Sequence, residues 1–163
     1  MRLFTCLFLL FIFASTLSMS VSAEEAIYKN KIEAPINDVH DRVYEALEKQ
    51  RFWVVFETNI GDNLKRFEDK WGDEYNQNQL EGFQSMVVCN GWYANKVSNA
   101  DPTALALCPL KVNLIHKQGI TTVLFARPSV FVQNSPALKV IDEVESLIIE
   151  AIETAAKQIT RKR

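Results

Sequence analysis

The chain has 163 residues, 48% of them hydrophobic, with 18 Lys and Arg against 20 Asp and Glu, a formal net charge of −2. This length is typical of one domain and is long enough to bury a continuous core. The charge balance disfavours a nucleic-acid-binding protein, because such proteins present a basic face or stripe.

The first 23 residues have the pattern of a secretory signal peptide. Arg2 supplies a positive charge, Leu3 to Phe13 is largely apolar, and small residues at Val21 and Ala23 fit a signal peptidase. A membrane anchor would need about 20 apolar residues, and Ser15 to Ser22 is too polar to complete one. We expect cleavage after residue 23, export to the periplasm or the extracellular space, no membrane anchor in the mature protein, and a single domain over residues 24–163.

The mature chain begins with the pattern strand, helix, strand. Residues 26–33 alternate loosely, and Pro35 suits the first turn of a helix whose apolar spacing continues to Leu47. Residues 52–58 are almost entirely β-branched and aromatic, which indicates a well-buried strand.

A second helix and a polar loop are expected next. Asp62 is a suitable N-cap for a helix that carries Leu64, Phe67 and Trp71 on one face. The following segment, residues 72–82, is polar and predicts a loop, and the sequence leaves open whether that loop is a functional lid.

A third strand and a helical excursion follow. Residues 83–89 have strand character, and residues 91–107 read as two short helical pieces. Asp101 and Pro102 open the second piece, as an N-cap followed by proline at the first helical position.

Residues 110–117 and 120–127 flank Gln118-Gly119, which predicts a tight hairpin. A two-residue loop pairs Lys117 with Ile120 and fixes which side chains share a face. The expected core-facing set is Val112, Leu114, His116, Thr121, Val123 and Phe125.

A long helix after Pro136 completes the chain, with an apolar stripe that runs from Val140 to Ala151. The order strand–helix–strand–helix–strand–helices–strand–strand–helix predicts an α+β fold. We expect a mixed, largely antiparallel sheet covered on one face by helices.

Cleavage would leave two cysteines, Cys89 and Cys108, which flank the helical excursion. A disulfide between them would close a loop of about 20 residues and stabilise the fold by roughly 3 kcal/mol. It would also require strands 83–89 and 110–117 to run antiparallel. A structural disulfide is therefore the favoured interpretation in an exported protein.

A redox or metal-binding pair is the alternative. Redox centres place their cysteines close together, as in C-x-x-C, and this spacing does not. A soft-metal site could combine both cysteines with Met86 and His116, but His116 is expected about 8 residues along a strand from Cys108, so we predict no metal site.

Recognisable catalytic chemistry is missing from the sequence. There is no G-x-S-x-G, no H-E-x-x-H and no glycine-rich phosphate loop, so we predict no catalytic residues and no cofactor.

The aromatic residues offer the best candidates for a binding site. We interpret Trp53 and Trp71 as filling the space between helices and sheet. Asn90, Trp92 and Tyr93 lie at a strand-to-helix turn beside a cysteine, and such turns frequently contact ligands.

The second half of the chain resembles the uncharacterised family catalogued as domain of unknown function 302. The resemblance rests on Asn90, Ala94, the segment from Asp101 to Leu110, Gly119, and Arg127-Pro128. It implies a compact α+β domain able to dimerise and carries over no activity. This chain departs from the family pattern in having Gly91 where proline is expected and in its flanking cysteines.

Three hypotheses about function remain. The leading one is an exported, non-catalytic domain that binds a small molecule or a protein partner. The second is a thiol-based redox or metal-handling protein that uses Cys89 and Cys108. The third is a structural homodimer whose interface is the exposed sheet face with Ile115, Ile120 and Leu124.

Overall fold

The computed structural model describes residues 26–161. The expected leader, residues 1–23, lies outside this range. In chain order the elements are β1 (Ile27–Ile32), α2 (Ile36–Lys49), β2 (Trp53–Asn59), α3 (Ile60–Lys65), α4 (Glu68–Trp71), η1 (Gly72–Glu74), β3 (Gly82–Cys89), α5 (Gly91–Ala100), η2 (Pro102–Leu107), β4 (Leu110–Lys117), β5 (Ile120–Ala126), η3 (Pro128–Phe131) and α6 (Leu138–Thr160).

The strands form one five-stranded sheet in the order β1-β5-β4-β3-β2. Every neighbouring pair is antiparallel, so the expected α+β class with a largely antiparallel sheet is confirmed. Strands β3 and β4 pair as the cysteine argument required, with Val88 opposite Leu110. Cys89 and Cys108 therefore lie at the same end of neighbouring strands.

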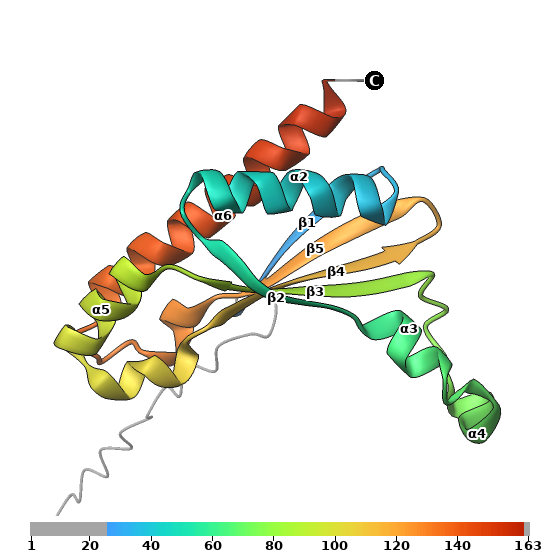
Figure 1. Cartoon of the computed structure of the whole chain (residues 1–163), viewed down its shortest axis with the longest axis horizontal. Coiled ribbons are helices and arrows are strands. Elements are labelled where there is room, and N and C mark those ends of the chain that lie inside the picture. The colour runs from blue at the N-terminus through green and yellow to red at the C-terminus, as the bar shows by residue number, and fades with distance from the viewer. Residues whose placement is uncertain (1–25, 162–163) are drawn as a thin grey trace, which may run out of the picture.

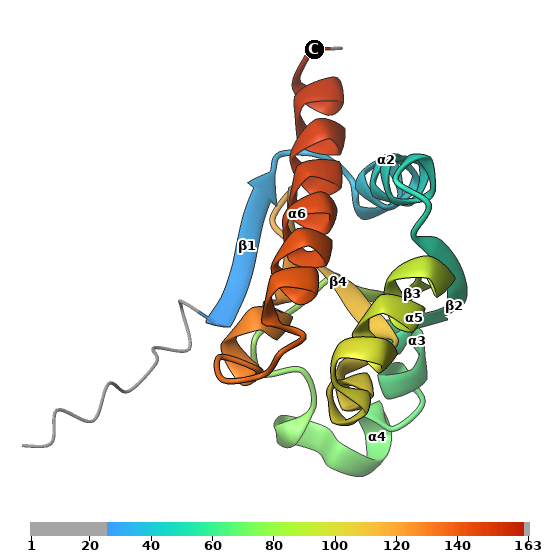
Figure 2. The same ribbon diagram turned by 90° about the vertical axis from the view of Figure 1, so that its left-hand side faces the viewer.

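Helices α2 and α6 cover one face of the sheet, as expected (Figure 1). In Figure 2, α2 is seen nearly end-on while α6 runs in the plane of the picture, so the two helices cross steeply. Each turns the apolar stripe of its sequence toward the strands. The core they close includes Val39, Val43, Leu47, Met86, Val88, Val112, Leu114, Val123, Phe125, Val144, Ile148, Ala151 and Ile152.

The hairpin between β4 and β5 has the predicted register, with Lys117 opposite Ile120. Gln118 and Gly119 both have positive φ, 52° and 77°, as the tight turn requires. Five of the six expected core-facing side chains are buried, and His116 is partly buried at the end of the sheet. The uncovered face carries Ile115, Ile120 and Leu124 by this register, and the homodimer expected there stays a prediction.

Strand β2 is not the well-buried strand that its sequence predicts. It is the edge strand of the sheet, and Trp53 and Phe56 are 54% and 59% exposed. Only Phe52, just before the strand, is buried. Helices cover one face alone, so the outward side chains of an edge strand meet solvent.

The second predicted helix is shorter and broken. It begins at Ile60, where Asn59 and not Asp62 is the N-cap, because the Asn59 side chain accepts the Asp62 backbone N–H. Phe67 interrupts it between α3 and α4. Phe67 and Trp71 stack on each other at 4.9 Å between ring centroids, yet both are exposed, so Trp71 does not fill the core.

The polar segment 72–82 is held by hydrogen bonds of its own and to the hairpin. Asn76 binds both the N–H and the carbonyl of Leu80, and Lys117 donates to the Asn78 carbonyl at 2.7 Å.

Within residues 26–161, no helix has the length and apolar character needed to cross a membrane.

Candidate functional site

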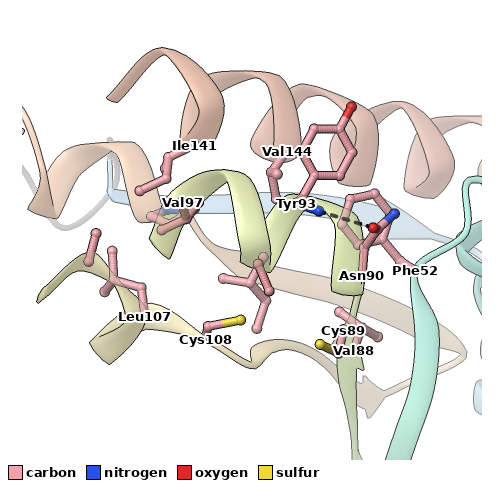
Figure 3. A pocket seen from close by; sticks show the side chains of 14 residues that line it. Phe52, Val88, Cys89, Asn90, Tyr93, Val97, Leu107, Cys108, Ile141 and Val144 are labelled. Atoms are coloured by element: carbon pink, nitrogen blue, oxygen red, sulfur yellow. Dashed lines mark hydrogen bonds between the residues drawn. The ribbon is translucent and has the colours of Figure 1, made fainter. Parts of the chain in front are cut away.

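A narrow apolar pocket opens at the end of the sheet where β3 passes into α5. Its walls come from β3, α5, η2, the start of β4 and α6 (Figure 3). The 14 lining residues are Phe52, Val88, Cys89, Asn90, Tyr93, Ala94, Val97, Ala104, Leu107, Cys108, Leu110, Pro128, Ile141 and Val144.

The pocket is small. Its cavity volume is about 40 Å³, although about 460 Å³ within its outline, the open mouth included, is unfilled by atoms. So small a volume admits a slim apolar group and excludes a bulky ring system. The side chains of its walls are nearly all apolar, and none of the 14 is charged.

Asn90 positions the helix that forms one wall. Its side-chain oxygen accepts the backbone N–H groups of Trp92 at 3.0 Å and Tyr93 at 3.2 Å. This is the N-cap that fixes the start of α5 against the end of β3. Asn90 therefore lines the pocket while its amide oxygen is already engaged.

Tyr93 contributes its ring to the pocket and its hydroxyl to the surface. The ring stacks on Phe52, and the hydroxyl donates to Glu143 Oε1 at 2.6 Å. This hydrogen bond raises the pKa of the Tyr93 phenol and, with a smaller effect of nearby Lys96, lowers that of the Glu143 carboxyl. The interaction joins α5 to α6 at the rim.

Trp92, the third residue expected at this turn, points away from the pocket. It is 67% exposed, and the Lys96 ammonium lies 5.9 Å from its ring centroid. The structure therefore brings Asn90 and Tyr93 together with both cysteines and leaves Trp92 outside.

Cys89 and Cys108 face each other at the pocket wall as free thiols, and no disulfide joins them in the structure (Figure 3). Cys89 is half-buried. Cys108 is exposed when the whole residue is considered, but its sulfur is partly buried. Burial of the sulfur, followed by the charge and hydrogen bond of the neighbouring Cys89, raises the pKa of the Cys108 thiol. Cys89 is therefore close enough to influence the protonation of Cys108.

Asp101 anchors the far wall of the pocket. Its carboxylate accepts the Thr103 backbone N–H at 3.0 Å, which caps η2, and the Ser135 hydroxyl at 2.5 Å. These bonds, with Ser135 the larger influence, lower the Asp101 pKa. The cap was expected from Asp101-Pro102, whereas the link to Ser135 was not.

The residues proposed for a soft-metal site do not converge. His116 lies at the opposite end of β4 from Cys108, where its Nδ1 contacts the Thr121 hydroxyl at 2.8 Å and Nε2 is 3.6 Å from Glu81. Met86 is buried in the main core. Across residues 26–161, no three His, Cys, Asp or Glu side chains are grouped so as to hold a metal ion.

Comparison with known proteins identifies a family and a fold. The family model described as "Domain of unknown function DUF302" matches residues 28–155. The crystal structure of an uncharacterized conserved protein DUF302 from Bacillus stearothermophilus has a TM-score of 0.67 to this chain, with 18% sequence identity over 80% of this chain and 98% of that one. That likeness shows the fold alone. A search of curated proteins gives no match.

Proposed function

The chain belongs to the family of domain of unknown function DUF302, and we propose that it is an exported, non-catalytic protein that binds a slim apolar ligand in the pocket between β3, α5 and α6. The observation that carries this proposal is the uncharged lining of a pocket too thin for a bulky ligand. Pockets of this kind bind through apolar contact, with a few polar groups that orient the ligand. The methylene chain of a linear alkyl group has the required section.

The polar atoms of the pocket support binding over catalysis. The Asn90 amide oxygen already accepts two backbone N–H groups, and the Tyr93 hydroxyl is committed to Glu143. A nucleophilic cysteine needs a lowered pKa, and that of Cys108 is raised. This also favours the ligand-binding hypothesis over a thiol-based redox catalyst.

Export rests on the leader pattern of the sequence, and it predicts an oxidised cysteine pair. Cys89 and Cys108 lie at the same end of neighbouring strands, which supports a disulfide between them in an oxidising compartment. Intact-mass measurement of protein recovered from the periplasm should show loss of residues 1–23 and no alkylation unless a reductant is added. Full-length protein retained in the cytoplasm would contradict export.

The binding proposal is tested with cis-parinaric acid, a slim, linear, fluorescent fatty acid. Ala94 lines the pocket, and Ala94→Phe should fill it and abolish the rise in probe fluorescence. Ala126→Phe is the matched control, because Ala126 is exposed at the end of β5, outside the pocket. Equal probe binding by both variants, or none by the wild type, would contradict the proposal.

A further inference from the structure

The two cysteines lie at opposite ends of the segment that covers the pocket, which consists of α5 and η2. Cys89 ends β3 immediately before α5, and Cys108 follows η2 immediately before β4. Both side chains also line the pocket wall. Whether the two sulfurs are free or bonded to each other therefore affects the pocket as well as the fold.

The pocket itself lies between two separate packed clusters. The main core holds the sheet, α2 and most of α6, whereas Val97, Ala104, Ala137 and Ile141 form a second cluster. A ligand in the pocket would contact residues of both. Its affinity consequently depends on how firmly α5 and η2 are held against the sheet and α6.

Noncovalent contacts already hold two sides of this segment. The Phe52–Tyr93 stack holds the start of α5, and the Asp101–Ser135 hydrogen bond holds the junction between α5 and η2. The C-terminal end of η2 has its thiol, Cys108, beside Cys89. A covalent bond there would fix the remaining end of the segment.

We propose that the Cys89–Cys108 pair is a redox latch on the ligand pocket, with the disulfide form binding ligand more tightly than the dithiol form. This inference rests on the ligand-binding function proposed above. In the step, each protein sulfur loses its hydrogen and one S–S bond forms between them, while a low-molecular-weight disulfide such as oxidised glutathione is reduced to two thiols. The bond preorganises the pocket wall, and binding then orders fewer groups.

Linkage makes the coupling measurable in both directions. If oxidation tightens ligand binding by some factor, bound ligand must favour the disulfide over the dithiol by the same factor. Coupling between linked sites is typically about 5–150-fold, and we expect about tenfold here. Reduced protein would release its ligand, so the latch would retain cargo in an oxidising compartment.

The test compares the affinity of cis-parinaric acid for wild-type protein equilibrated with oxidised glutathione and with reduced glutathione. We expect about tenfold tighter binding by the oxidised form. The ratio of the squared concentration of reduced glutathione to the concentration of oxidised glutathione at which half the disulfide is reduced should shift by the same factor when the probe is saturating. The double variant Cys89→Ser/Cys108→Ser is the control: whatever its own affinity for the probe, that affinity should be the same in both buffers.

Each other outcome has a distinct meaning. Equal affinity in both buffers, tighter binding by the reduced form, or failure of the disulfide to form would overturn the latch and leave the ligand-binding function standing. A redox effect that persists in the double variant would also overturn it. Absence of probe binding in either buffer would overturn the ligand-binding function, and the latch with it.

Discussion

Phe52 and Tyr93 lie stacked at the rim of the pocket, with ring centroids 6.0 Å apart and ring planes 5° from parallel. Phe52 is 1% exposed and precedes the edge strand β2, whereas Tyr93 stands on the first turn of α5. The stack therefore joins the edge of the sheet to the helix that covers the pocket.

Truncation of Phe52 should destabilise the protein strongly. Phe52→Ala removes a fully buried ring, and core Phe→Ala changes typically cost about 3–5 kcal/mol of unfolding free energy. Urea denaturation monitored by circular dichroism measures the loss. Phe52→Leu keeps most of the apolar volume and should lose clearly less; equal losses in the two variants would contradict a packing role.

Thr121 should be needed for its hydroxyl as well as its size. It is fully buried, donates to the Ala34 carbonyl at 2.7 Å and contacts His116 Nδ1 at 2.8 Å. Because its single hydrogen goes to the carbonyl, the hydroxyl accepts from the Nδ1–H of His116.

Thr121→Val keeps the shape of the side chain and leaves a buried carbonyl without this donor. Such a group costs about 1–3 kcal/mol of unfolding free energy. Urea denaturation again gives the value. Thr122→Val, on the opposite face of β5, is the matched control and should change stability little; a similar loss there would indicate a general effect of valine in the strand.

Local patterns predicted the hairpin and the covering helices, because each depends on spacing along a few turns of chain. Gln118-Gly119 fixes a two-residue loop, that loop sets which β4 and β5 side chains share a face, and the apolar pattern shows which face is the core. The exposure of β2 could not be read in this way. Residues 52–58 would look the same in a central strand, and strand order is decided by pairing between distant segments.

The pocket was predictable only where a single turn builds it. Asn90 follows the end of a strand and Tyr93 comes three residues later, and both line the pocket. Trp92 lies outside the pocket, because successive residues of an α-helix point about 100° apart and Tyr93 is the one that faces it. Ile141 and Val144 belong to the apolar stripe of the last helix, and only tertiary structure, which brings α6 beside α5, places them at the pocket.

Asp101 should make stability depend on acid pH. Hydrogen bonds from Ser135 and Thr103 hold its pKa below the ordinary value, so the folded state favours the ionised carboxylate. That contribution is complete above the pKa of the unfolded chain, about 3.9, and is lost as pH falls through the lower folded value.

Asp101→Asn keeps a cap that can accept the same hydrogen bonds and removes the titration. The stability advantage of the wild type over this variant should therefore be constant from neutral pH to about pH 5 and shrink as pH falls further. Urea denaturation of both proteins across this range measures it. An advantage that grows toward acid pH would show that the sign of the pKa shift is wrong.

Cys108 should react more slowly with alkylating reagents than an ordinary thiol. The thiolate is the reactive form, and burial together with Cys89 raises the Cys108 pKa, so less thiolate is present at neutral pH. Cys89→Ala removes the second contribution and keeps most of the first. In reduced protein, the variant should therefore react faster with iodoacetamide at pH 7, and its rate should rise with pH over a lower range than in the wild type.

Mass spectrometry resolves the rate at Cys108, and the rates in urea, where both proteins are unfolded, should coincide. An unchanged pH profile in the folded variant would show that burial alone raises the Cys108 pKa and that Cys89 has no effect on it.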